Sequence, residues 1–160
     1  NSVMGGCAKM GVEFVACAAG KYFPNKDVRK TCGEIAKETG AKLSFNSSVN
    51  EAVKGANVIY TDVWVSMGEA ESVWEERIKE LSPYRVTSKV MNKADKNAVF
   101  MHCLPAFHDL KTVIGKEMGK KFGITEMEVT DEVFESERSI VFREAENRMH
   151  TIKAVMASTL

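Results

Sequence analysis

The segment 98–110, AVFMHCLPAFHDL, gathers more groups that could do chemistry than any other stretch of this sequence. His102 and Cys103 follow a short apolar run, Pro105 comes two residues later, and His108 lies six positions after His102. A thiol among imidazoles could be a nucleophile or a metal ligand. A cysteine at the end of a strand could also be a small buried apolar side chain. Residue types alone leave all three interpretations open.

Spacing argues against the two reactive interpretations of Cys103. A cysteine nucleophile needs a histidine base, yet adjacent side chains on a strand point to opposite faces, so His102 is not expected to pair with Cys103. No standard metal-ligand spacing joins His102, Cys103, His108 and His150, so we predict no metal site. Pro105 keeps Leu104 out of the helical conformation. We therefore expect carbonyl groups of this loop to project outward and accept hydrogen bonds from amine or amide donors of a ligand.

A second polar cluster, DVWVSMG, occupies residues 62–68. Asp62 could pair with an ammonium and Ser66 with the neighbouring carboxylate, the set needed to hold an amino acid backbone. The simpler alternative is that Asp62 and Ser66 cap the helix expected at 70–81.

Arg148 lies near the start of the helix expected at 144–160. An arginine beside a helix N-terminus suits an anion or a polarised carbonyl. The alternative is an exposed ion pair with Glu144, four residues earlier on the same helix.

The elements that must position these groups alternate between apolar strands and amphipathic helices. Strands are expected at 12–18, 41–45, 57–65 and 98–104, and helices at 1–11, 24–40, 47–56, 70–81, 87–94, 112–123 and 144–160. The segment between the last two helices, including 128–136, is expected to be a loop. This order predicts an α/β fold, a doubly wound parallel sheet with helices on both faces, forming one domain over 1–160. Because ligands bind at the carboxyl ends of parallel strands, the two polar clusters should share one edge of the sheet.

Composition excludes several classes of partner. Acidic and basic side chains balance at 22 each among 160 residues, so nothing favours nucleic acid or an anionic membrane. The apolar runs are too short to span a bilayer, and no signal peptide is visible. The four cysteines form neither a CxxC pair nor a disulfide framework, which predicts reduced thiols in a cytoplasmic protein. The sequence also lacks GxGxxG and P-loop patterns.

Three strings taken in order are far more specific than any one of them. DVWVSMG (62–68), FMHCLP (100–105) and EAENRMHTIKAVM (144–156) closely resemble the carboxy-terminal half of ornithine carbamoyltransferase, and the resemblance runs from Asn1 to Leu160. The long stretch after HCLPAFHD resembles bacterial, often catabolic, members. The sister aspartate carbamoyltransferases would have HPLPR in place of HCLPA and would lack SMG.

The resemblance implies transfer of a carbamoyl group from carbamoyl phosphate to the δ-amine of ornithine, giving citrulline and phosphate, with no metal or organic cofactor. For ornithine, it implies that Asp62 binds the α-ammonium and that Ser66 and Met67 close over the α-carboxylate. Cys103 would lie at the reacting amine, where it positions the amine and helps to remove its proton.

For carbamoyl phosphate, the resemblance implies that Cys103 and the Leu104 carbonyl contact the carbamoyl nitrogen and that Arg148 contacts the carbamoyl oxygen. Cys103 and Arg148 are thus the expected catalytic residues. The family is typically a homotrimer or a higher assembly, with subunits that bind ornithine and carbamoyl phosphate.

One departure from the family pattern is large. The STRT-type and HPxQ motifs of the carbamoyl phosphate domain do not occur in this sequence. We therefore expect the chain to be the ornithine-binding half, with little or no transferase activity alone. Two alternatives stay open: a non-catalytic module that binds an amino acid or a protein, and a carbamoyltransferase for another amine such as putrescine. SMG argues against putrescine, which has no α-carboxylate.

Overall fold

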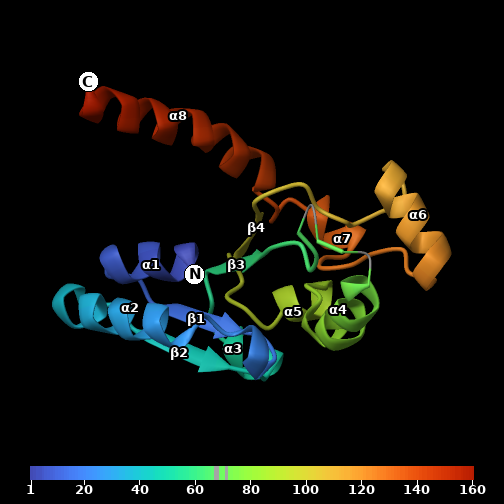
Figure 1. Ribbon diagram of the computed structural model, residues 1–160, viewed down its shortest axis with the longest axis horizontal. Helices are drawn as coiled ribbons and strands as arrows, with labels where there is room; N and C mark the ends of the chain where they lie inside the picture. Colours follow the sequence, from blue (N-terminus) through green and yellow to red (C-terminus); the bar gives the residue numbers. More distant parts are fainter. Residues whose placement is uncertain (67–68, 71) are drawn as a thin grey trace. The chain divides into compact units, whose positions relative to one another are not determined.

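The computed structural model describes residues 1–66, 69–70 and 72–160 of the chain (Figure 1). These residues form two compact units, Asn1–Ala52 and Val53–Leu160. Each unit contains a pair of parallel strands, so the predicted parallel α/β class is confirmed. Within the described residues, no helix is long and apolar enough to cross a membrane.

The first unit contains two strands and three α-helices, with a short 3-10 turn. In chain order these are α1 (Ser2–Lys9), β1 (Phe14–Cys17), η1 (Gly20–Tyr22), α2 (Lys26–Thr39), β2 (Leu43–Asn46) and α3 (Val49–Ala52). β1 pairs with β2 in parallel, with Phe14 opposite Leu43. The helices expected at 1–11 and 24–40 and the strand expected at 12–18 are present within slightly narrower bounds, and the strand expected at 41–45 begins two residues later and ends one residue later.

Local signals explain why α2 begins and ends where it does. The Asn25 side chain accepts a hydrogen bond of 2.8 Å from the Val28 N–H at the start of the helix. Gly40 ends α2 with a φ of +80°, a backbone conformation that glycine adopts without steric cost. The core of this unit combines apolar side chains from α1 and α2 with others from β1 and β2: Met4, Ala8, Cys32, Val28, Ile35, Phe14, Leu43 and Phe45.

The second unit carries both polar clusters. Its elements are β3 (Val58–Thr61), α4 (Val73–Leu81), η2 (Ser82–Tyr84), α5 (Ser88–Met91), β4 (Val99–His102), α6 (Val113–Phe122), α7 (Asp131–Phe134) and α8 (Val141–Thr159). β3 pairs with β4 in parallel (Figure 1). The expectation of a loop over 128–136 is wrong in part, because α7 forms one helical turn there.

β4 is fixed by the segment that leads into α8. The backbone N–H of Phe100 donates to the carbonyl of Arg138 at 2.8 Å, and the Ile140 N–H donates to the Phe100 carbonyl at 3.0 Å. Phe100 is fully buried. The Arg138 guanidinium adds a hydrogen bond of 2.8 Å to the carbonyl of Ala98. These bonds hold the start of α8 beside β4 and thereby set the place of the side chains on its first turns.

Candidate functional site

The parallel pairing of β3 and β4 brings the two polar clusters to one edge of their sheet. Thr61 lies opposite His102 in the register, so Asp62 and Cys103 both follow directly after the paired residues. The Cys103 thiol donates a hydrogen bond to Asp62 Oδ1, with an Sγ–Oδ1 distance of 3.1 Å. The prediction that these clusters share one edge is confirmed.

The Asp62 carboxylate receives a second donor from its own loop. The backbone N–H of Val63 donates to Oδ1 at 2.7 Å, on the oxygen that also accepts the Cys103 thiol. Asp62 is exposed. An exposed carboxylate fixed in place through one oxygen can present its other oxygen, Oδ2, to a ligand cation.

The loop that follows Asp62 is held by an ion pair rather than by a helix cap. Ser66 donates its backbone N–H to Glu69 Oε2 at 2.7 Å, and Glu69 Oε1 pairs with Arg77 at 3.2 Å. Arg77 also donates to the carbonyl of Trp64 at 2.9 Å. Ser72 occupies the N-cap position of α4, so the alternative that Asp62 and Ser66 cap this helix is wrong.

The Ser66–Met67 pair stays a prediction as a carboxylate-binding element. Ser66 is exposed, with its N–H already bonded to Glu69. Met67 lies outside the described residues.

Cys103 is an exposed free cysteine. Partial burial and the hydrogen bond to the Asp62 carboxylate raise the pKa of Cys103 to about 11, and a hydrogen bond from the Tyr60 hydroxyl acts weakly in the opposite direction. A reactive cysteine needs a lowered thiol pKa. The raised pKa of Cys103 therefore disfavours a thiolate nucleophile near neutral pH.

The residue before Pro105 adopts an unexpected conformation. Residues before proline usually take an extended backbone, but Leu104 has a φ of +53° and precedes a cis peptide bond to Pro105. The Leu104 N–H donates to His102 Nδ1 at 2.9 Å. His102 is fully buried whereas Cys103 is exposed, which confirms that these neighbours point to opposite sides.

Tyr60 and Glu144 also contact this site: no sequence pattern indicated Tyr60, and the sequence offered Glu144 only as a partner of Arg148. Glu144 Oε2 accepts the backbone N–H of His102 at 3.1 Å. Burial, together with the adjacent Glu144 carboxylate and Cys103, raises the pKa of the Tyr60 hydroxyl well above its usual range. Glu144 thus accepts a hydrogen bond from the end of β4. Within the described residues no ion pair joins it to Arg148, so the alternative of a Glu144–Arg148 ion pair is wrong.

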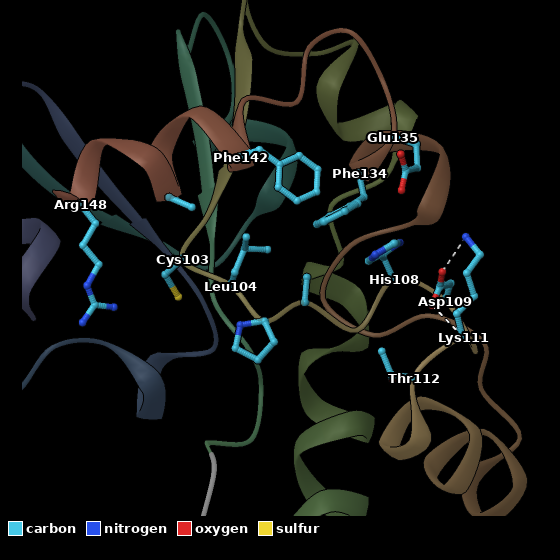
Figure 2. Close-up of a pocket in the computed structure, with 13 residues that line it drawn as sticks. Cys103, Leu104, His108, Asp109, Lys111, Thr112, Phe134, Glu135, Phe142 and Arg148 are labelled. Carbon is cyan, nitrogen blue, oxygen red and sulfur yellow. Dashed lines mark hydrogen bonds and ion pairs between the residues drawn. The ribbon is translucent and has the colours of Figure 1, made fainter. Parts of the chain in front are cut away.

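Arg148 lines an open cavity of about 730 Å³ together with Cys103 and Leu104. Figure 2 shows Arg148 reaching down from α8 on the same side of this cavity as Cys103 and Leu104. The cavity also has Lys111 on its wall, but Lys111 forms an ion pair of 2.9 Å with Asp109. The structure therefore brings Cys103, Leu104 and Arg148 to one cavity, and Asp62 is joined to it through its contact with Cys103.

One further group of side chains could hold a cation. Ligand atoms of His108, Asp131 and Glu135 lie within 4.8 Å of one another. His108 Nδ1 is already hydrogen-bonded to Asp131 Oδ1 at 2.7 Å, and its ring stacks on Phe134. Of the four residues considered as metal ligands from the sequence, only His108 belongs to this group. The other three are His102, Cys103 and His150.

The match to known proteins covers almost the whole chain. A family model described as "Aspartate/ornithine carbamoyltransferase, Asp/Orn binding domain" matches residues 1–159. The chain belongs to this family. The catabolic ornithine carbamoyltransferase of Treponema denticola is 58% identical over all 160 residues, and its counterpart in Clostridium perfringens (strain 13) is 57% identical over 159 residues. Family membership confirms the resemblance carried by the three strings.

A solved carbamoyltransferase structure supports the same assignment of fold. The ornithine carbamoyltransferase from Pyrococcus furiosus has a TM-score of 0.81 and 36% identity, covering 98% of this chain and 44% of that one. The chain spans 47% of the length of the Treponema relative and 48% of the Clostridium relative. This chain thus corresponds to about half of each of these family members.

Proposed function

We propose that this chain supplies the ornithine-binding half of an enzyme that transfers a carbamoyl group from carbamoyl phosphate to L-ornithine. The observation that carries the proposal is the contact between Asp62 and Cys103 at an edge of the sheet, beside a cavity that Leu104 and Arg148 line. Curated relatives of 57–58% identity bear the name ornithine carbamoyltransferase. In this proposal, residues 1–160 act as one ornithine-binding domain.

Ornithine binds through groups at the two ends of its α-amino acid moiety. Asp62 Oδ1 is occupied by the Cys103 thiol and the Val63 N–H, so Oδ2 takes the α-ammonium. Ser66 and Met67 close over the α-carboxylate. A substrate lacking the carboxylate, such as putrescine, loses this second contact and should bind more weakly.

The reaction is a direct attack of the ornithine δ-amine on the carbonyl carbon of carbamoyl phosphate. The new N–C bond forms, the C–O bond to phosphate breaks, and the amine proton ends on the departing phosphate. As written, the reaction balances without a metal ion or an organic cofactor. Arg148 donates to the carbamoyl oxygen as negative charge develops there, and the Leu104 carbonyl accepts from the carbamoyl nitrogen.

Cys103 orients the amine and forms no covalent bond. Its pKa of about 11 leaves the thiol protonated near neutral pH, which also disfavours the expectation that it removes the amine proton. Its hydrogen bond to Asp62 instead links the groups that hold the two ends of ornithine.

A segment beyond these residues is proposed to bind the phosphate. A phosphate needs several fixed donors, whereas Lys111 in this cavity is paired with Asp109. The matched relatives are about twice as long as this chain, which leaves room for a carbamoyl phosphate domain. We propose a homotrimer or a larger assembly in the cytoplasm. Because both of these relatives are named catabolic, we place the reaction in the arginine deiminase pathway.

Isothermal calorimetry on the full 160-residue chain tests the binding half of this proposal. Ornithine should give measurable heat, putrescine much less, and Asp62→Asn should abolish the ornithine signal. Asp27→Asn, which makes the same change at an exposed carboxylate on α2, serves as the matched control and should leave the ornithine signal unchanged. No heat with ornithine, with or without carbamoyl phosphate, would favour a module that binds a protein instead.

A further inference from the structure

Beneath the loop 103–107 lies a pair of fully buried titratable side chains that the proposed reaction does not use. Neither His102 nor Glu128 has any exposed surface. His102 Nε2 lies 3.1 Å from Glu128 Oε1. Burying two such groups destabilises the folded state unless their pairing geometry is good and hydrogen bonds satisfy their remaining polar atoms.

The hydrogen bonds fix the tautomer of His102. Its Nδ1 accepts the Leu104 N–H at 2.9 Å, so this nitrogen carries no proton in the neutral ring. The proton is therefore on Nε2, which donates it to Glu128 Oε1. A continuous chain of two hydrogen bonds thus runs from Glu128 through His102 to the backbone of Leu104, where φ is +53°.

Glu128 also holds the far side of the same loop. Its Oε1 accepts the Phe107 N–H at 2.7 Å. The same oxygen therefore receives donors from His102, just before the loop, and from Phe107, at the end of the loop. The backbone of Glu128 is itself anchored, because its carbonyl accepts the Val86 N–H at 2.9 Å. The loop is therefore fastened at both ends to one fixed point.

The second carboxylate oxygen of Glu128, Oε2, lowers the stability of the folded protein. Oε2 is buried and has no hydrogen-bond partner within the described part of the chain. An unsatisfied buried acceptor destabilises the folded state. A carboxylate is thus retained at a site where an apolar side chain would avoid that cost.

We propose that Glu128 is a positioning residue, which through His102 and through the Phe107 N–H holds residues 103–107 in the conformation that presents Cys103 and the Leu104 carbonyl to substrate. This inference rests on the proposed function for its catalytic consequence, but its structural part stands independently. Reacting groups displaced by about 1 Å can lose roughly 10²-fold in rate. A loosened loop should therefore slow carbamoyl transfer.

Nuclear magnetic resonance on the full chain tests the structural part. In the unaltered protein the His102 ring should show the Nε2-protonated tautomer, and the Leu104 and Phe107 amides should be protected from exchange. Glu128→Leu removes the acceptor of the Phe107 N–H and the partner that holds the His102 ring, whose Nδ1 accepts the Leu104 N–H. It should therefore speed exchange at both amides by about tenfold, the factor expected for one lost hydrogen bond at each. Glu128→Gln keeps an acceptor oxygen and should restore protection.

Glu126→Leu is the matched control, because the Glu126 carboxylate accepts the Asp131 N–H and does not bind the loop. It should leave both loop amides unchanged. If Glu128→Leu does not fold, a pair of His102 variants decides the question. His102→Asn keeps an acceptor for the Leu104 N–H and should preserve the protection of this amide from exchange. His102→Gln should lose that protection. Equal exchange at Leu104 in the two variants would overturn the proposal.

Kinetics separate this inference from the proposed function. The assay uses a chimaera in which this chain replaces the matching half of the Treponema denticola relative. Glu128→Leu should lower kcat by roughly 10²-fold, with rescue by Glu128→Gln. If the unaltered chimaera makes no citrulline but the amide pattern holds, the function fails and the positioning role stands. If the chimaera is active and Glu128→Leu changes neither kcat nor the amides, the positioning role fails.

Discussion

The Cys103 thiol donates a hydrogen bond of 3.1 Å to the Asp62 carboxylate, although 41 residues separate them in sequence. Both residues follow the last paired positions of adjacent parallel strands, so the sheet itself creates the contact. The contact places an anionic group that can hold a substrate ammonium beside a neutral thiol that can orient a substrate amine.

Asp62→Asn should lower the pKa of Cys103 below its value of about 11, because the carboxylate charge and hydrogen bond both disfavour the thiolate. The thiolate fraction at pH 9 should therefore rise. The rate of Cys103 alkylation against pH, followed on the Cys103 peptide by mass spectrometry, measures the shift. The peptides of Cys7 and Cys17 provide internal controls. An unchanged profile at Cys103 would show that Asp62 does not govern this thiol.

Tyr60→Phe should move the same profile in the opposite direction. The Tyr60 hydroxyl hydrogen-bonds Cys103 and lowers its pKa, so removing it should raise the pKa and slow alkylation at pH 9. The same peptide-resolved assay applies. A faster reaction in Tyr60→Phe would contradict the hydrogen bond from Tyr60 to the thiol.

Cys103→Ala should reduce citrulline formation by the chimaera by roughly 10- to 100-fold, the loss of a charge-assisted hydrogen bond. Loss of a covalent nucleophile would cost far more, roughly 10⁶-fold. Steady-state kinetics distinguish the two magnitudes. Cys103→Ser keeps a donor to Asp62 and should recover part of the rate.

Gly115→Ala should destabilise the second unit by about 1–3 kcal/mol, because a Cβ at this position would lie 2.7 Å from the Asp109 carbonyl oxygen. Gly33→Ala is the matched control, since a Cβ there meets nothing within 4 Å and alanine favours the interior of α2. Both tryptophans, Trp64 and Trp74, lie in the second unit. Urea unfolding followed by tryptophan fluorescence should therefore respond to Gly115→Ala and not to Gly33→Ala.

Local sequence signals predicted the elements well where they act over a few residues. Asn25 and Gly40 define the ends of α2 because an N-cap side chain and a left-handed glycine are local devices. The shared edge of β3 and β4 was also predictable, because parallel strands have only one arrangement of their carboxyl ends.

Contacts distant in sequence were not predictable. Glu128 lies in MEVTD, a string with no distinguishing pattern, and its role depends on a histidine 26 residues earlier. The positive φ of Leu104 contradicts the usual preference before proline and depends on the His102 ring beneath it. Asp62 and Ser66 resembled helix caps because the sequence does not reveal that α4 begins only at Val73, with Ser72 at the N-cap position.

The most direct test of the central claim is citrulline formation by the chimaera with two single variants, Asp62→Asn and Arg148→Gln. If Asp62 binds ornithine and Arg148 stabilises the carbamoyl oxygen, Asp62→Asn should chiefly raise the KM for ornithine. Arg148→Gln should instead chiefly lower kcat, by roughly 10²- to 10³-fold. An active chimaera in which neither variant changes these constants would contradict the assignment of this site.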